Sequence, residues 1–330
     1  MEYCKLPGTD ISVSRLSLGT WNFSGAKVWG EADDKESIRV IQMAVEKGIN
    51  LIDSAESYGD GRAEEVTGAA VKDRRDKVVL ATKVYSNALR YDEVIAHCEA
   101  SLKRLDTDYI DLYQIHYPNP DIPLSEPYSA FEKLKKDGKI RLFGACNFGP
   151  NCLKETESTP LVTNQLPYSL IWRVAEKKVI PATAERGVYV WAFSPLAQGL
   201  LTGKFRSIDD VPMGRRENRF YDSKWKQGRH SDCGFETEIF DLVGKLAKLS
   251  EESGFSMAAI AMAFLKNNPA VGSILNGARS ERQLLQNIEC FEAEVPKEVV
   301  ERAIALSESL KQAEGDNADM WISENGGRIN

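Results

Sequence analysis

Short runs of apolar residues recur along the chain and alternate with longer segments in which apolar positions repeat with helical spacing. The short runs are rich in Val, Ile and Leu, and several are bounded by Gly, Asn or Asp. This alternation predicts repeated β–α units and a parallel sheet. We expect eight such strands, which begin near residues 15, 50, 77, 109, 140, 161, 188 and 271.

Helical spacing between the strands predicts helices over 34–47, 62–72, 92–105 and 126–137. In the first of these, Ile38, Ile41 and Val45 fall on one face, which we expect to pack on the sheet. Asp33 is suited to cap its N-terminus, with Glu36 three residues further on.

Eight consecutive β–α units are typical of a closed (β/α)8 barrel, the TIM barrel, of about 250 residues plus insertions. Residues 3–14 predict an N-terminal β-hairpin that covers the bottom of the barrel. A polar segment from about 204 to 235 predicts a long surface loop on the C-terminal face. Because no internal repeat or linker divides the sequence, we expect 1–330 to be a single barrel domain with a polar tail from about 311.

The composition is that of an ordinary globular protein, with 42% hydrophobic and 28% charged residues. A net charge of −7 disfavours nucleic acid and anionic membrane as partners. The longest purely apolar run, 257–265, is far shorter than the ~20 residues that a membrane helix needs. We therefore expect no nucleic-acid partner and no membrane partner.

The cysteines are scattered, which bears on both metal binding and location. They lie at positions 4, 98, 146, 152, 233 and 290, with no C-x-x-C pair and no metal-like cluster. This spacing predicts reduced thiols in a cytoplasmic protein and no metal site.

Polar side chains end three neighbouring predicted strands, where a (β/α)8 barrel carries its chemistry. Asp53 ends one strand and precedes Tyr58 by five residues, while Lys83 and His116 end the next two. Each has a purely structural alternative. Asp53 and Lys83 could form only a structural ion pair, Tyr58 could be a loop aromatic, and His116 could be a hydrogen-bonded core histidine. Together, at consecutive strand ends, they predict an active site.

Residues 53–59 resemble the aldo-keto reductase signature, in which an Asp precedes the catalytic Tyr by five positions. The resemblance extends from about residue 5 to 288. Further matching blocks are Ala81-Thr82-Lys83, Gln114-Ile115-His116, Gly138-Lys139-Ile140-Arg141 with Gly144 and Asn147-Phe148, Asn164-Gln165 with Tyr168, Ser194-Pro195-Leu196 with Gly199, and Gly277-Ala278-Arg279 with Gln283 and Asn287. The resemblance implies NADP-dependent interconversion of an aldehyde or ketone with the corresponding alcohol, by direct hydride transfer.

The four residues suit that reaction, which delivers a hydride to carbon and a proton to oxygen. Tyr58 would be the general acid/base, and the cation of Lys83 would lower the pKa of its phenol. Asp53 would hold Lys83 charged and in position. His116 would donate a hydrogen bond to the substrate oxygen.

The chain has no G-x-G-x-x-G fingerprint between an early strand and helix, so the cofactor site is inferred from the family resemblance. It implies that Asn147 and Gln165 bind the nicotinamide carboxamide and that Phe193 stacks on the ring. Cys146 departs from the Ser that the family commonly has there, and its thiol is a weaker hydrogen-bond donor than a hydroxyl. The implied cofactor-binding set is Gly19, Thr20, Trp21, Cys146, Asn147, Gln165, Phe193, Ser194, Leu196, Gln198, Gly199, Leu201, Lys204, Arg215, Gly277, Arg279, Gln283 and Asn287.

Arg279 precedes a predicted helix whose N–H groups suit a phosphate. Its guanidinium would bind a 2′-phosphate, which favours NADPH over NADH. A capping box of Ser280 and Gln283 is an alternative role for the same segment, and both roles are compatible.

Four aromatic residues, Trp21, Trp29, Tyr85 and Tyr117, are expected to wall a pocket for a sugar or an aromatic carbonyl. In the tail, Trp321 either anchors the chain to the barrel or closes the pocket. Two other functions stay open: a cofactor-sensing accessory subunit of an ion channel, and an isomerase or aldolase that uses Lys83 as a Schiff-base amine.

Overall fold

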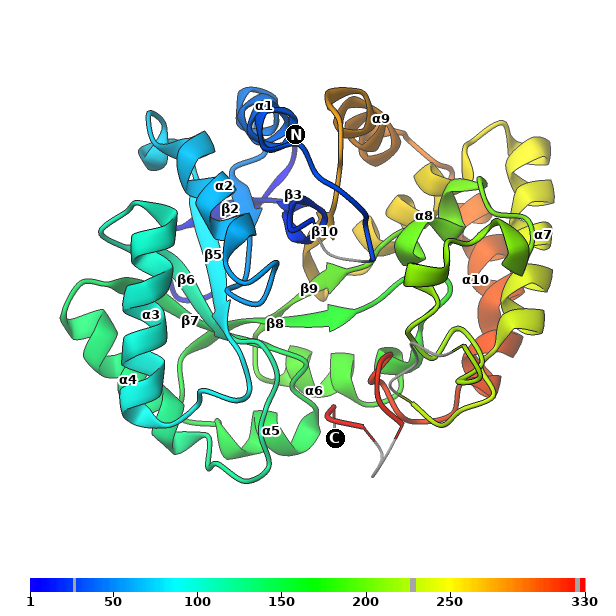
Figure 1. Ribbon diagram of the computed structural model, residues 1–330. Helices are drawn as coiled ribbons and strands as arrows, with labels where there is room; N and C mark the ends of the chain where they lie inside the picture. The colour runs from blue at the N-terminus through cyan, green and yellow to red at the C-terminus, as the bar shows by residue number, and fades with distance from the viewer. Residues whose placement is uncertain (26–27, 226–229, 324–326, 330) are drawn as a thin grey trace.

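A closed barrel of parallel strands lies at the centre of the computed structural model, which describes residues 1–25, 28–225, 230–323 and 327–329 (Figure 1). The strands follow one another in the order β10-β3-β4-β5-β6-β7-β8-β9, so each pairs with its neighbour in sequence and β10 closes the ring. Their bounds are β3 Leu16–Gly19, β4 Leu51–Asp53, β5 Val79–Val84, β6 Ile110–Ile115, β7 Ile140–Cys146, β8 Leu161–Pro167, β9 Tyr189–Phe193 and β10 Val271–Asn276. The predicted (β/α)8 barrel is confirmed.

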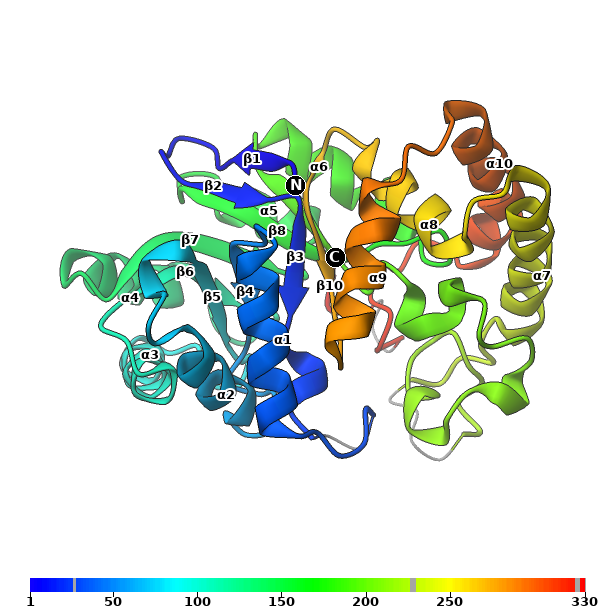
Figure 2. The same cartoon turned by 90° about the horizontal axis from the view of Figure 1, so that it is seen from above.

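Helices surround the barrel on the outside. They are α1 Asp34–Glu46, α2 Arg62–Val71, α3 Tyr91–Leu105, α4 Ser125–Lys136, α5 Pro150–Glu155, α6 Val179–Glu185, α7 Glu236–Ser253, α8 Met257–Lys266, α9 Glu281–Glu292 and α10 Lys297–Ala313. Figures 1 and 2 show α7 beside α10, so this side of the barrel has a second helix outside the usual ring.

Asp33 and Ser280 cap helix N-termini as predicted, but the described residues form neither reciprocal contact of a capping box, and Oε1 of Gln283 instead accepts from the backbone N–H of Arg279 (2.8 Å). Asp33 accepts hydrogen bonds from the backbone N–H groups of Lys35 (2.8 Å) and Glu36 (3.1 Å) at the start of α1. Ser280 accepts one from the backbone of Gln283 (3.3 Å) at the start of α9. Such caps satisfy N–H groups that have no partner inside the helix.

The packed face of α1 differs from the predicted one. Ile41 is buried as expected, but Ile38 and Val45 are only half-buried. Val40 and Ala44 occupy the buried positions instead. The helix is therefore rotated relative to the face that its larger side chains indicate.

The predicted N-terminal hairpin, β1 Tyr3–Lys5 and β2 Ser12–Ser14, lies at the end of the barrel where the strands begin (Figure 2). Leu6 and Val13 are buried there against side chains that fill the barrel interior. These are Leu51, Val79, Ala81, Leu112, Val162, Trp191 and Leu275. Because the hairpin seals this end, a ligand reaches the interior from the other one.

The segment 204–235 was expected to be a polar surface loop, and this is wrong for its central part. Phe220 and Tyr221 are 1% exposed, and Arg216 and Asn218 are also buried. The backbone N–H of Arg219 donates to the carbonyl of Met320 (2.9 Å), so the loop packs against the C-terminal tail. The tail itself begins after α10, slightly later than expected. No helix in the part of the chain that the structure describes is long and apolar enough to cross a membrane.

Candidate active site

The carboxylate of Asp53 and the ammonium of Lys83 form a buried ion pair at the open end of the barrel. Their Oδ2 and Nζ atoms are 2.7 Å apart, and the Lys83 side chain is fully buried. β4 and β5 pair so that Asp53 lies opposite Ala81, which places Lys83 two residues on and on the same face. The sheet register therefore brings the two charges together.

The same ammonium has two further oxygen neighbours. Nζ of Lys83 donates to the carbonyl of Ser54 (2.7 Å) and to the hydroxyl of Tyr58 (3.5 Å). Tyr58 reaches this position through a tight turn, in which Asp60 and the two glycines around it all have positive φ. A side chain at Gly59 would meet the carbonyl oxygen of Ser24 at 2.4 Å. The turn therefore requires glycine there.

The pKa of Tyr58 differs from the sequence-based expectation. Burial raises it to about 12, while the positive charge of Lys83 opposes the rise without reversing it. Burial alone would lower the pKa of Lys83, but Asp53 holds it above its usual value in net. At neutral pH the site thus contains a neutral phenol beside a charged ammonium.

His116 follows β6 directly and packs among three aromatic rings. It stacks on Tyr117 (centroids 5.2 Å apart) and lies edge to face with Tyr58 and Tyr85. Its Nδ1 lies 3.3 Å from the hydroxyl oxygen of Ser57. Burial, and then the nearby cations, lower the pKa of His116 well below its usual value. The imidazole is therefore neutral near pH 7 and offers one N–H as a donor.

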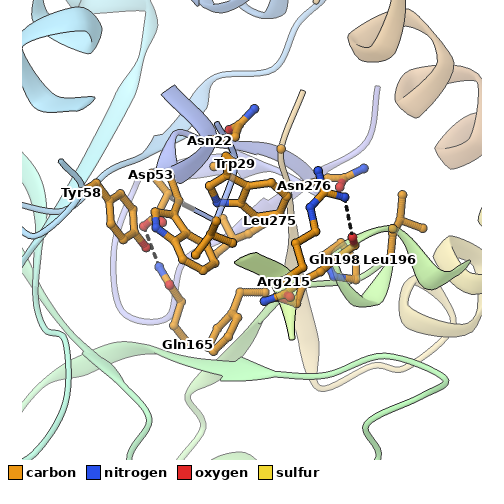
Figure 3. A pocket seen from close by; sticks show the side chains of 18 of the residues that line it. Asn22, Trp29, Asp53, Tyr58, Gln165, Leu196, Gln198, Arg215, Leu275 and Asn276 are labelled. Atoms are coloured by element: carbon orange, nitrogen blue, oxygen red, sulfur yellow. Dashed lines mark hydrogen bonds between the residues drawn. The ribbon is translucent and has the colours of Figure 1, made fainter. Parts of the chain in front are cut away.

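Gln165 makes a contact that its sequence context did not predict. Its Nε2 donates to Oδ1 of Asp53 across 2.6 Å, marked in Figure 3. Asn147 lies beside His116, and its Nδ2 donates to the carbonyl of that residue (3.0 Å). Oδ1 of Asn147 is buried and has no hydrogen-bond partner among the described residues. Its Nδ2 also lies 3.0 Å from Sγ of Cys146.

One large cavity, of about 1000 Å³, opens beside these residues. Most of the residues proposed from the sequence line it: Gly19, Trp21, Trp29, Asp53, Tyr58, Tyr85, His116, Tyr117, Cys146, Gln165, Phe193, Ser194, Leu196, Gln198, Gly199, Lys204, Arg215, Gly277, Arg279, Gln283 and Asn287. Figure 3 shows several of these side chains around the cavity.

Four proposed residues do not line the cavity. Lys83 and Asn147 lie behind the side chains that do. Thr20 is buried and donates to the carbonyl of Asp53 (3.1 Å), so it supports the end of β4. Leu201 is buried in the main hydrophobic core. The assignment of Thr20 and Leu201 as direct cofactor contacts is therefore not supported by their positions.

The cavity extends toward α9, where its walls carry polar atoms without protein partners. Nε2 of Gln198, Nε of Arg215 and Nδ2 of Asn276 are buried and have no hydrogen-bond partner in the described part of the chain. All three are N–H donors. Unpaired buried donors are costly, so this arrangement fits an acceptor-rich ligand such as a phosphate.

Cations gather at the same end. Lys204, Arg215, Arg279 and Arg282 all line the cavity, and none makes an ion pair within the described ranges. Burial lowers the pKa of Lys204 and of Arg215, and neighbouring arginines lower both further. An anion bound here would relieve that repulsion.

Arg279 has protein partners that the sequence did not reveal. Its guanidinium donates to the backbone carbonyls of Trp29 and Glu31, in the segment between β3 and α1. It therefore ties this segment to the end of β10 as well as facing the cavity. A phosphate at Arg279 would share or replace these two bonds.

Several lining residues were missed from the sequence: Asn22, Val28, Ser57, Pro195, Thr202, Leu275, Asn276, Arg282, Gln286, Ile322 and Arg328. Arg282 and Gln286 are one helical turn apart on α9 and next to predicted residues, so helical spacing was a usable signal. The tail residues carried no such signal.

The C-terminal tail has both of the roles that its sequence left open, since it is anchored to the barrel and also closes one side of the cavity. Met320 is buried and anchors the tail. Trp321 lines the cavity and lies edge to face with Trp21, with ring centroids 5.9 Å apart. Trp29 contacts Trp21 in the same way (5.3 Å). One end of the cavity therefore has an aromatic wall to which the tail contributes.

Comparison with known proteins agrees with this geometry. A family model described as "Aldo/keto reductase family" matches residues 15–321. Aldo-keto reductase YhdN of Bacillus subtilis (strain 168) is 36% identical over 86% of this chain and 87% of its own length. NADH-specific methylglyoxal reductase of Escherichia coli (strain K12) is 32% identical over 87% and 93%. A probable voltage-gated potassium channel subunit beta of Oryza sativa subsp. japonica is 29% identical over 94% and 97%.

Solved structures show the same likeness. The glycerol dehydrogenase of Gluconobacter oxydans aligns with a TM-score of 0.76 and 29% identity, over 96% of each chain. An aldo/keto reductase of Klebsiella pneumoniae, solved with NADP and acetate, aligns with a TM-score of 0.73 and 25% identity, over 99% and 98%.

Proposed function

The chain belongs to the aldo/keto reductase family, and from this premise we propose that it interconverts small aldehydes or ketones with their alcohols, with Tyr58 as general acid/base. The observation that carries the proposal is the buried series of Tyr58, Lys83 and Asp53, which borders a cavity whose far end offers unpaired donors and cations.

We assign the cofactor as NADP(H), with weaker use of NADH. Bound NADPH supplies the hydride for reduction, and NADP+ accepts it in the reverse direction. The unpaired donors on Gln198, Arg215 and Asn276 would hold the pyrophosphate. Arg279 and Arg282 would hold the 2′-phosphate, and Phe193 would lie against the nicotinamide.

The protein side chains then handle the proton. Tyr58 donates its hydroxyl proton to the carbonyl oxygen as that oxygen becomes an alcohol. The ammonium of Lys83, 3.5 Å away, stabilises the phenolate that remains, and Asp53 keeps the ammonium in place. The neutral His116 donates an N–H to the same substrate oxygen and fixes its direction. In alcohol oxidation the phenolate of Tyr58 accepts the proton instead.

Two alternatives have different support. Lys83 has its ammonium engaged by Asp53 and by the carbonyl of Ser54, and its pKa is raised, which disfavours a Schiff-base amine. A cofactor-sensing role is favoured by the similarity to the potassium channel subunit. Turnover with simple carbonyl compounds separates a sensor from an enzyme.

A cytoplasmic location completes the proposal, supported by free thiols at all six cysteines. We also propose that 1–330 functions as one barrel domain, because the tail packs into the site rather than apart from it.

The test is a steady-state assay of a panel of aldehydes, ketones and alcohols, with NADPH, NADH and their oxidised forms. The proposal expects reduction of several carbonyl compounds and a lower KM for NADPH than for NADH. Tight NADPH binding without turnover of any compound would instead support the sensor.

A further inference from the structure

Arg328, near the end of the tail, lines the aromatic end of the cavity. Its guanidinium lies over the ring of Tyr117, with Cζ 3.5 Å from the ring centroid. Tyr117 in turn stacks on His116. Three flat groups thus lie in series, with a cation at one end and the proposed hydrogen-bond donor to the carbonyl at the other.

A buried carboxylate fixes the position of Arg328. Asp319 is 0% exposed and accepts from Nε of Arg328 (2.9 Å) and from its backbone N–H (3.0 Å). Asp319 also accepts from the backbone N–H of Trp321 (2.9 Å) and of Ile322 (3.3 Å). Asp319 does not line the cavity. A ligand therefore meets the guanidinium and not the carboxylate.

The tail around Asp319 is itself held from two sides. Nη1 of Arg219 donates to the carbonyls of Asn317 (2.8 Å) and Asp319 (2.9 Å). The indole N–H of Trp172 donates to the carbonyl of Ala318 (3.0 Å). Because these bonds already order the tail, binding a ligand at Arg328 does not require the side chain to be immobilised anew.

Part of the guanidinium remains available. Nη1 of Arg328 has no hydrogen-bond partner in the part of the chain that the structure describes. Asp53 and Glu217 are the acidic residues that line the described cavity, and Asp53 is already paired with Lys83 and Gln165. The charge of Arg328 extends to the reaction centre, where it is one of the causes that lower the pKa of His116, after burial and Lys83.

We propose that Arg328 determines substrate specificity by binding a negatively charged group, a carboxylate or a phosphate, on the carbonyl compound. This inference rests on the proposed reductase function. Trp21, Tyr85 and Trp321 would contact the body of the substrate, while His116 and Tyr58 meet its carbonyl oxygen. The preferred substrates are thus anionic aldehydes or ketones.

The test compares each charged substrate with an uncharged relative that carries the same aldehyde. para-Carboxybenzaldehyde and para-nitrobenzaldehyde form the carboxylate pair, and glycolaldehyde phosphate and glycolaldehyde form the phosphate pair. Each is assayed with the unmodified enzyme, with Arg328→Met and with Arg328→Lys. Lys245→Met, an exposed change on α7, is the control for loss of one positive charge.

A charge-assisted hydrogen bond predicts that Arg328→Met lowers kcat/KM for the anionic member of at least one pair by about ten- to a hundredfold. For the neutral member we expect a change of less than about twofold. Arg328→Lys should recover part of the loss, and Lys245→Met should leave all four values unchanged. The pair that responds identifies the anion as carboxylate or phosphate.

Equal losses for charged and neutral members would overturn the inference and would give Arg328 a packing role. Unchanged values for both members of each pair would overturn it as well. If no carbonyl compound is turned over, the proposed function fails instead. Arg328 is then tested by calorimetric titration of benzoate and benzamide into the NADP+-saturated protein. Loss of benzoate binding alone in Arg328→Met supports the inference, and equal binding contradicts it.

Discussion

The side-chain amide of Gln165 donates to Oδ1 of Asp53 across 2.6 Å, while Lys83 bonds the other carboxylate oxygen at 2.7 Å. Gln165 lies on β8 and Asp53 on β4, and these strands are opposite each other in the ring. This hydrogen bond therefore spans the open end of the barrel. It links Gln165, which is implied to bind the nicotinamide carboxamide, to the ion pair that positions Tyr58.

Gln165→Met keeps the length of the side chain but removes the donor. Oδ1 of Asp53 then retains only the amide of Gln114 at 3.4 Å. Since a hydrogen bond to a buried charge contributes about 1.5–3 kcal/mol, we expect the free energy of unfolding to fall by that amount. Urea unfolding measures it. Gln286→Met, on the exposed side of α9, is the matched control and should change stability by less than about 0.5 kcal/mol.

Lys83→Met should destabilise the protein by about 3–5 kcal/mol, because it leaves the carboxylate of Asp53 buried without its counter-charge. Tyr58→Phe loses only a 3.5 Å hydrogen bond and should cost less than about 1 kcal/mol. Thermal and urea unfolding at neutral pH compare the two variants. Adding Asp53→Asn to Lys83→Met should recover part of the loss. Equal stabilities for Lys83→Met and Tyr58→Phe would refute the ion-pair argument.

The dependence of activity on pH follows from the two perturbed groups. Burial raises the pKa of Tyr58 to about 12, so the phenol is protonated at all pH values well below that. Burial also lowers the pKa of His116, which stays neutral. Carbonyl reduction should therefore have a kcat that is flat between about pH 6 and 9. Alcohol oxidation needs the phenolate, so its kcat should rise with pH across the same range. A reduction profile that falls between pH 6 and 9 would be inconsistent with these protonation states.

Arg279→Ala should raise the Kd for NADPH by about ten- to a hundredfold and the Kd for NADH much less, because only NADPH carries the 2′-phosphate. Fluorescence titration of both cofactors provides the values. Arg302→Ala, which removes an exposed ion pair between α10 and Glu252 of α7, controls for the change in net charge. If both cofactors weaken equally, the hydrogen bonds of Arg279 to the backbone of Trp29 and Glu31 are its main contribution.

The strand ends could be predicted from the sequence because the side chains there depart from the apolar pattern of the strands. Asp53, Lys83 and His116 are polar residues at the ends of three apolar runs, and a parallel barrel brings such ends together. Lys83 lowers the pKa of Tyr58 as expected, but burial raises it by more, and only the folded geometry gives the relative size of the two effects.

The contribution of the tail could not be predicted in the same way. Residues after α10 have no periodicity, and Arg328 reaches the cavity through contacts with Asp319, nine residues before it, and with Tyr117, far away in sequence. The buried part of the 204–235 segment was missed for a related reason. Its polar composition suggested exposure, yet Arg216 and Arg219 are buried and satisfied by backbone carbonyls.

The most direct measurement of the central claim is carbonyl reduction by Tyr58→Phe, combined with NADPH titration of the same purified variant. General acid catalysis contributes about a hundredfold or more to the rate, so kcat should fall by at least that factor. The Kd for NADPH should stay within about twofold, because the hydroxyl bonds only Lys83 in the described structure. A variant that binds NADPH normally and keeps a near-normal kcat would contradict the assignment of Tyr58 as the proton donor.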